Sequence, residues 1–163
     1  MNKLFKSALV TVTGALLIMG SVPSVYADKG DQGVDWSIYQ GSQGKFGYGH
    51  DKFAIAQIGG YHGYIYDQST YATQVQYAIA QGKRAHTYMW WQDITDYATA
   101  DNVLDYFLPK IQTPKGSIVA LDVESGGQNT DVIMHALQRI KNAGYTPMVY
   151  GYKNFLQDST DLQ

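Results

Sequence analysis

The sequence predicts an α/β fold built on a parallel β-sheet, and two observations support this prediction. Short apolar segments recur at regular intervals, with segments of helical periodicity between them. The punctuation agrees, because Gly82 and Gly144 follow helical segments as C-caps and Pro147 opens a strand. Strands that alternate with helices pair in parallel through right-handed crossovers. Such a sheet is either an open doubly wound sheet or the first part of a barrel.

The first half of the predicted sheet begins after a short polar stretch at residues 28–33. Residues 34–36 form the first candidate strand, and the apolar run at 53–58 forms the second. A helix is expected over residues 68–81, where the apolar residues recur at helical spacing: Tyr71, Val75, Ala78 and Ile79.

The second half repeats the alternation of strands and helices. Residues 84–91 form the third strand, and a helix follows over residues 98–111, its end bracketed by two prolines, Pro109 and Pro114. The apolar run at 118–123 is the fourth strand. The helix expected over 131–143 has apolar residues at Val132, Ile133, Ala136, Leu137 and Ile140, and residues 148–150 form the fifth strand.

The N-terminus predicts export. Lys3 and Lys6 precede an apolar stretch at residues 8–19, and residues 25–27 match a small-x-small cleavage site, so residues 1–27 are interpreted as a secretory signal peptide. That stretch is shorter than the roughly 20 residues needed to span a bilayer, so no membrane association is expected after cleavage. Residues 28–163 are interpreted as one domain of a secreted protein, and a monomer is the default expectation.

The composition of residues 28–163 excludes some functions. Two of the 12 basic side chains lie in the signal peptide, so residues 28–163 carry ten basic and 14 acidic side chains, a formal net charge of −4. This charge gives no reason to bind nucleic acid. With no cysteine, stability must come from a packed core, and thiol chemistry is excluded. The 14 tyrosines and three tryptophans suit sugar stacking and core packing alike.

Polar residues gather where the predicted strands end. Asp35 lies at the end of the first strand, and the others follow on later strands: His86, Tyr88 and Trp90, then Asp122 and Glu124, then Tyr150 and Tyr152. In an α/β barrel this edge is the catalytic face. The glycine pairs at residues 41–44 and 59–60 match no phosphate-binding loop, which argues against a nucleotide site.

Asp122 and Glu124 are the most informative pair, because side chains at i and i+2 of a strand share a face. Burial of two charges costs several kcal/mol unless they are paired or neutralised, and acid/base chemistry is one reason to retain them. The alternatives are a buried ion-pair network, although no Lys or Arg lies between Lys115 and Arg139, and a Mg²⁺ or Ca²⁺ site. No His/Cys spacing supports zinc.

Three segments together resemble glycoside hydrolase family 25, the lysozymes that cut the bond between muramic acid and glucosamine in peptidoglycan. They are residues 33–41 (GVDWSIYQG), 121–124 (LDVE) and 145–150 (YTPMVY), and the resemblance runs from about Gly33 to the end. Asp67 before the helix at 68–81 also resembles the family's second βα unit. The family 18 chitinases are the nearest rival, but their motif has further aspartates where this chain has Ser117 and Ala120.

The resemblance implies an irregular TIM-like (β/α) barrel and N-acetylmuramidase activity without a cofactor or metal. Glu124 is expected to be the general acid, with its proton held to higher pH by Asp122 and apolar walls. Asp122 would attack the anomeric carbon or orient the substrate's N-acetyl group, both with retention. Asp35 completes the acidic cluster by resemblance, its alternative being a capping aspartate.

The aromatic residues at the strand ends are expected to bind the glycan strand of peptidoglycan. By resemblance, Tyr88 matches the family's active-site tyrosine, and we expect Trp90, Tyr150 and Tyr152 to bind sugar as well. Trp91 is a further candidate for stacking on a sugar ring. His86 shares a strand face with Tyr88 and Trp90, but a hydrogen-bonded core histidine is the expected state.

The chain also departs from the family. Residues 57–60 (QIGG) replace a Lys-Ala-Thr/Ser-Glu-Gly type segment, and five strands are predicted where the family has eight, without the acidic residue expected on the last. We therefore expect a C-terminally incomplete catalytic domain, with a non-catalytic wall-binding protein as the alternative. An exposed edge on the fifth strand predicts poor solubility or loose packing.

Overall fold

The computed structural model describes residues 29–159, and the predicted signal peptide lies outside these residues. The elements follow in the order β1 (Gly33–Trp36), η1 (Ile38–Gln40), β2 (Phe53–His62), β3 (Ile65–Asp67), α1 (Tyr71–Ala80), β4 (Arg84–Gln92), α2 (Tyr97–Phe107), η2 (Leu108–Lys110), β5 (Ile118–Asp122), α3 (Thr130–Asn142), β6 (Thr146–Tyr150) and α4 (Lys153–Ser159). The sheet order is β1-β2-β4-β5-β6, all parallel, and β3 pairs antiparallel with β2. The predicted α/β class with five parallel strands is confirmed, and the described sheet is not closed.

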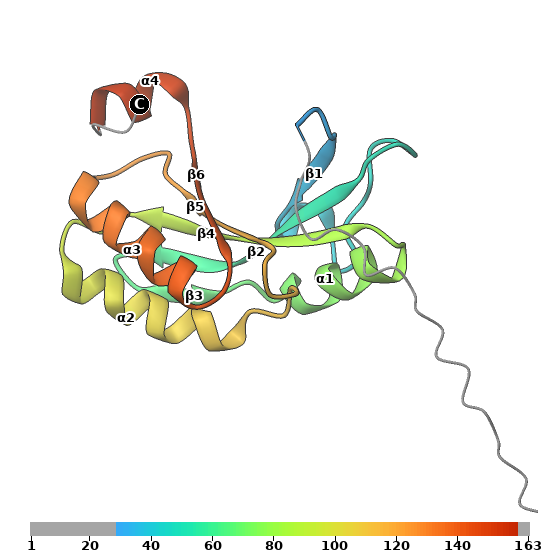
Figure 1. The fold of residues 1–163 in the computed structure, drawn as a ribbon, viewed down its shortest axis with the longest axis horizontal. Helices are drawn as coiled ribbons and strands as arrows, with labels where there is room; N and C mark the ends of the chain where they lie inside the picture. Colours follow the sequence, from blue (N-terminus) through green and yellow to red (C-terminus); the bar gives the residue numbers. More distant parts are fainter. Residues whose placement is uncertain (1–28, 160–163) are drawn as a thin grey trace, which may run out of the picture.

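The sheet separates an apolar layer from a concave face. Figure 1 shows α1, α2 and α3 on the same side of the sheet, and α2 and α3 begin near the edge at which the preceding strands β4 and β5 end. Because side chains alternate along a strand, Met89 and Leu121 face the helices while Tyr88 and Ala120 face the opposite side. The candidate catalytic residues therefore lie on the concave face and its rim.

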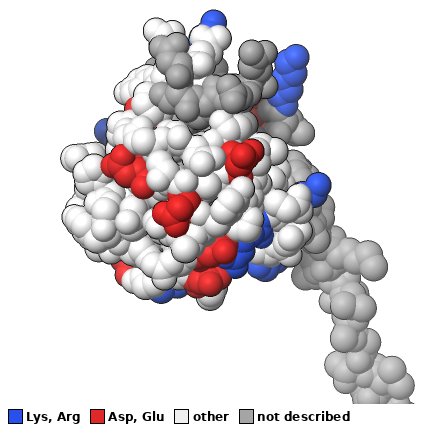
Figure 2. Space-filling model, turned by 90° about the vertical axis from the view of Figure 1, so that its left-hand side faces the viewer, with Lys and Arg blue, Asp and Glu red and all other residues white. Residues whose placement is uncertain are grey.

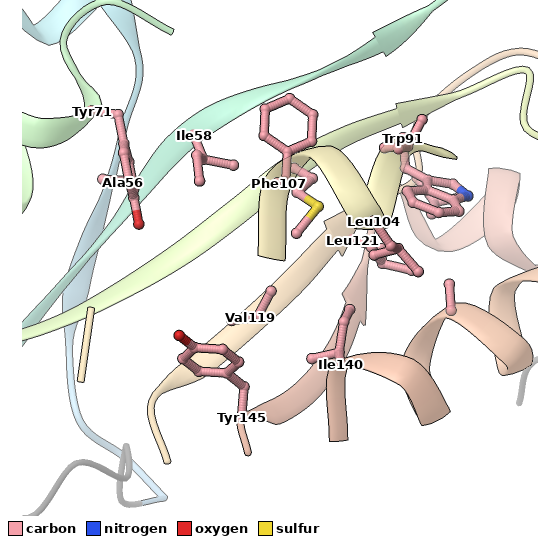
Figure 3. Close-up of a cluster of buried hydrophobic side chains, with 14 of the residues drawn as sticks. Ala56, Ile58, Tyr71, Trp91, Leu104, Phe107, Val119, Leu121, Ile140 and Tyr145 are labelled. Atoms are coloured by element: carbon pink, nitrogen blue, oxygen red, sulfur yellow. The ribbon is translucent and has the colours of Figure 1, made fainter. Parts of the chain in front are cut away.

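The main core fills the space between the sheet and the helices (Figure 3). Each helix contributes a stripe at helical spacing. The fully buried members are Ala100, Val103, Leu104 and Phe107 from α2 and Ile133, Ala136 and Ile140 from α3. Burial of each large side chain contributes about 1.5–3 kcal/mol, so this layer holds the strand ends in place.

The main difference from the sequence prediction is a β-hairpin. The sequence predicts a strand at 53–58 and a helix from residue 68, whereas β2 continues to His62, turns at Gly63 and returns as β3. Gly63 has a φ of 75° and the His62 N–H bonds the Tyr64 carbonyl across the turn. The Gln68 N–H then donates to the Ile58 carbonyl, which delays the start of α1 to Tyr71. Aromatic residues around a central glycine were the available signal.

A β-bulge in β2 prepares this hairpin. The register with β4 shifts between Gln57 and Gly59, whose φ is 147°. A Cβ on Gly59 would collide with the Tyr66 carbonyl oxygen and approach the Phe107 ring within 2.9 Å. The position therefore requires glycine, both for its backbone conformation and for the close approach of β3.

Gly59→Ala is expected to destabilise the protein by about 3 kcal/mol or more, since it adds strain and a backbone collision at once. Gly63→Ala is the matched control. Its φ is also positive, but a Cβ there meets no atom within 4 Å, so a cost of only about 1 kcal/mol is expected. Urea unfolding of both variants measures the difference, and equal costs would contradict the packing explanation.

Candidate active site

The predicted carboxylates come from two strands of the sheet, β1 and β5. Asp122 is the last residue of β5, where it pairs with Trp90 of β4 on one side and Tyr150 of β6 on the other. Glu124 follows one residue beyond Val123, and Asp35 lies near the end of β1. Glu124 and Asp35 both act electrostatically on Asp122, so the three carboxyl groups form one cluster.

Asp122 is the electrostatic centre of this cluster. Its side chain is only 4% exposed, and burial raises its pKa to about 7, with smaller contributions from the charges of Glu124 and Asp35. A hydrogen bond with the Tyr150 side chain opposes this rise. The Oδ1 atom is buried and has no hydrogen-bond partner within residues 29–159.

The raised pKa lies on a different carboxyl from the one that the sequence suggested. The sequence analysis expects the retained proton on Glu124, whereas Asp122 is the group whose burial holds it. Asp122 lies deeper in the sheet because it is still paired within β5, while Glu124 lies in the loop and is half-buried.

The loop that carries Glu124 is fixed to the end of β4. The Ser125 hydroxyl donates to Gln92 Oε1 at 2.6 Å, and the Gln92 amide nitrogen lies 3.4 Å from the Asp122 carbonyl oxygen. The Asp93 carboxylate accepts a 2.7 Å hydrogen bond from the Gly127 N–H, and the Asp93 backbone has a positive φ of 52°. These bonds hold the β5–α3 loop against the β4–α2 loop, so Glu124 is presented by a restrained backbone.

Two predicted aromatic residues contact each other beside Asp122. Tyr88 and Tyr150 pack edge to face, with 5.9 Å between ring centroids. Burial and the charge of Asp122 raise the pKa of both hydroxyls well above the ordinary value. Both therefore stay protonated and are hydrogen-bond donors, Tyr150 toward Asp122.

A cleft of about 380 Å³ opens beside these residues. Tyr88 and Trp90, both predicted, line it together with residues that the sequence analysis missed: Ser37, Ile38, Tyr39, Gln57, Tyr66 and Gln68. Tyr39 is 91% exposed at the mouth of the cleft. Most of the missed residues come from the loop after β1 and the β2–β3 hairpin, which was not predicted. The cleft is aromatic with a few polar groups, a composition that suits a sugar.

Two other aromatic predictions have different outcomes. Trp91 is 0% exposed and belongs to the core between sheet and helices, so the expectation that it stacks on sugar is wrong. Alternation along β4 explains this, since Trp90 and Trp91 face opposite sides. Tyr152 lies just beyond β6 with 67% of its surface exposed, and its sugar contact stays a prediction.

His86 is buried on the concave side, as expected of a core histidine. Its Nδ1 accepts a 3.1 Å bond from the Ile118 N–H, and burial lowers its pKa to about 4. The imidazole is therefore neutral at neutral pH, with its proton on Nε2. That atom has no partner within the described residues, and it lies by a pocket of about 310 Å³ that Phe53, Ile55 and Met148 help to line.

Figure 2 shows the face at the left of Figure 1, where α2 and α3 begin, and acidic side chains lie on it among uncharged surface.

Within residues 29–159, no group of three or more His, Asp or Glu residues is arranged to hold a metal ion. No helix in this part of the chain is long and apolar enough to cross a membrane.

Comparison with known proteins agrees with this geometry. The family described as glycosyl hydrolases family 25 matches residues 34–163, which is most of the chain. The chain belongs to this family. The resemblance inferred from Asp35, Asp122 and Glu124 with their flanking residues is thereby confirmed.

Two phage proteins and one solved structure are similar to this family 25 chain. A lysozyme of Streptococcus phage Cp-9 is 38% identical over 73 residues, 42% of this chain and 21% of the phage protein. A D-alanyl-L-alanine endopeptidase of Streptococcus phage B30 is 32% identical over 73 residues, 42% of this chain and 16% of its own length. The modular autolysin LytC from Streptococcus pneumoniae matches with a TM-score of 0.61 at 18% identity, covering 81% of this chain and 35% of LytC, which shows the fold.

The burial of Asp122 predicts a stability that depends on pH. Its pKa is about 7 in the folded protein and about 3.9 when unfolded, so the folded state binds the proton more tightly. The stability that the protonated carboxyl contributes is complete below about pH 4 and is lost as pH rises through 7. Asp122→Asn removes this loss, so the variant should gain about 1–3 kcal/mol relative to the parent between pH 4.5 and 8.

Urea unfolding at pH 4.5 and pH 8 measures this gain. His86 titrates in the same range but is present in both proteins, so its contribution cancels in the difference. Asp131→Asn, an exposed carboxyl in the first turn of α3, is the control and should show no such gain. A stability difference between Asp122→Asn and the parent that is constant with pH would contradict the buried, protonated carboxyl.

Proposed function

We propose that this chain is the catalytic part of a secreted lysozyme that hydrolyses the β-1,4 bond between N-acetylmuramic acid and N-acetylglucosamine with retention. The observation that carries this proposal is the group of Asp35, Asp122 and Glu124 near an aromatic cleft, one of whose residues, Trp90, pairs with Asp122 across the sheet. Family 25 membership and similarity to a phage lysozyme support the same substrate, peptidoglycan. The chain spans only about a fifth to a third of these relatives, so the activity is proposed for the part described here.

Glycoside hydrolysis needs one proton and one negative charge at the scissile bond. In this proposal Asp122 supplies the negative charge, because a pKa of about 7 lets its carboxyl lose the proton near neutral pH, and Glu124 supplies the proton. Glu124, half-buried in the loop beyond β5, is more exposed than Asp122, which supports its role as the proton donor. We assign it the general acid, which later acts as the base that activates water.

Asp122 is the more buried of the two carboxyl groups. As a carboxylate it attacks the anomeric carbon, or it orients the substrate's N-acetyl group for that attack, and both routes retain configuration. The Tyr150 hydroxyl donates to the Asp122 carboxyl and fixes its orientation in either route. Asp35 adds negative charge that favours an oxocarbenium-like transition state.

Secretion fits this substrate. The signal peptide inferred over residues 1–27 would deliver residues 28–163 to the bacterial cell wall, where glycan strands are the partner. Neither a cofactor nor a metal is needed by the two-carboxylate mechanism, and we propose a monomer that binds neither nucleic acid nor membrane after cleavage.

A second candidate is a non-catalytic wall-binding protein. The described sheet is open beyond β6, while the aromatic cleft that would hold sugar is already formed by β1, β2, β3 and β4. Binding therefore needs less of the family barrel than catalysis does. The two candidates differ in one result, which is lysis.

Glu124→Gln is expected to lower peptidoglycan hydrolysis by at least about 100-fold, since it removes the proton donor but keeps the side-chain shape. The measurement is the turbidity of a cell-wall suspension with the full chain, paired with a pull-down on the same insoluble material. Asp131→Asn, on the outer surface of α3, is the charge-matched control and should keep the parent rate.

Unchanged hydrolysis in Glu124→Gln would contradict the catalytic assignment. Binding of the parent chain to peptidoglycan without any lysis would favour the wall-binding candidate. If the parent chain neither binds nor lyses peptidoglycan, both candidate functions are contradicted.

A further inference from the structure

Three side chains around the β2–β3 hairpin form a hydrogen-bonded chain in the wall of the cleft. The Gln68 amide nitrogen donates to Gln57 Oε1 at 2.8 Å, and the Gln57 amide nitrogen donates to the Tyr66 hydroxyl oxygen at 3.2 Å. All three line the 380 Å³ cleft, and Gln57 is only 6% exposed. The chain of bonds therefore lies inside the site and is sheltered from water.

This chain has a direction. An amide nitrogen only donates and an amide oxygen only accepts, so a Gln57 oxygen occupied by Gln68 leaves the Gln57 nitrogen to face Tyr66. The Tyr66 oxygen accepts that bond and makes no other hydrogen bond within residues 29–159. Its own proton is then free to be donated to a bound molecule.

The Tyr66 hydroxyl keeps this proton under working conditions. Burial raises its pKa above the ordinary value of 10.0, and the charge of Asp122 adds to the rise. Tyr66 lines the same cleft as Tyr88 and Trp90, the two cleft residues of β4. Tyr66 is thus a neutral donor beside the acids rather than part of them.

We propose that Tyr66 is a substrate-binding residue that donates to the acetamido carbonyl oxygen of an N-acetylated sugar, and that Gln57 and Gln68 are positioning residues that fix the direction of this donation. A carbonyl oxygen only accepts, which matches a hydroxyl whose lone pair is already engaged by Gln57. The rings of Tyr39 and Trp90 in the same cleft offer apolar surface for the acetamido methyl group. The inference rests on the proposed function and names the group on the substrate that this wall recognises.

The test compares two uncharged trisaccharides with the same β-1,4 linkage. N,N′,N″-triacetylchitotriose carries acetamido groups and cellotriose carries hydroxyls in their place, so the ratio of their dissociation constants reports acetamido recognition without requiring hydrolysis. Binding to the full chain is followed by tryptophan fluorescence or NMR titration. Tyr66→Phe should weaken triacetylchitotriose about tenfold and cellotriose less than twofold.

Tyr64→Phe is the matched control, because it also removes a tyrosine hydroxyl from this hairpin. Tyr64 is 67% exposed, and its ring centroid lies 6.2 Å from that of Tyr66. It should leave the ratio unchanged. An equal loss in both Tyr→Phe variants, or a loss in Tyr66→Phe that is the same for the two sugars, would overturn the assignment of Tyr66.

Gln57→Glu tests the direction of the chain. A carboxylate only accepts, so it would take the Tyr66 proton for itself and lower the ratio about fivefold, whereas Gln57→Lys, which only donates, should retain it. Any effect of the added charge falls on both sugars and cancels in the ratio. In the Tyr66→Phe background, Gln57→Glu should change the ratio less than twofold, and a larger change would overturn the positioning role.

These outcomes separate the inference from the proposed function. A parent chain that prefers triacetylchitotriose through Tyr66 but lyses no cell wall supports the inference while the lysozyme proposal fails. A parent chain that lyses cell walls but shows no acetamido preference overturns the inference and leaves the lysozyme proposal intact.

Discussion

The burial of the Asp122 carboxyl is the constraint on which the candidate site depends. A charge at this position would be costly, because the side chain is almost fully covered and one of its oxygens has no protein partner. The fold raises the pKa of the group to about 7, so that the charge is avoided at lower pH, and places the Tyr150 hydroxyl against it. Buried polar groups of this kind reduce stability, which agrees with the catalytic role proposed for this strand end.

The rest of the sheet can be understood as the support of that carboxyl. Alternation along β4 and β5 sends Met89 and Leu121 into the core and Tyr88 and Asp122 to the other face, so a well-packed apolar layer fixes the polar one. The loop bonds from Gln92 and Ser125 extend this order to Glu124. Stability and reactivity are thereby assigned to opposite faces of the same strands.

The alternating pattern made the parallel strands and the Asp122–Glu124 pair predictable, because both depend on short-range periodicity. The hairpin was not predicted, because β3 is three residues long and its pairing with β2 depends on a bulge at Gly59, which no local pattern reports. Tyr39, Gln57 and Tyr66 were missed with it. The different burial of Asp122 and Glu124 was also beyond sequence reasoning, because i and i+2 spacing gives both carboxyls one face but not one depth.

The hairpin is also where this chain departs from the motif expected of family 25, and the two facts are connected. A Lys-Ala-Thr/Ser-Glu-Gly type segment would place charges in this wall, whereas Gln57, Gly59 and Gly60 leave it neutral and let β3 approach the strand closely. In place of a charge, the wall carries the chain of amides that ends at Tyr66. A neutral donor adds no ion-pair attraction that would draw the proton away from the Asp122–Glu124 pair. A wall that carries directed hydrogen bonds instead of charges is therefore compatible with the nearby carboxyl groups.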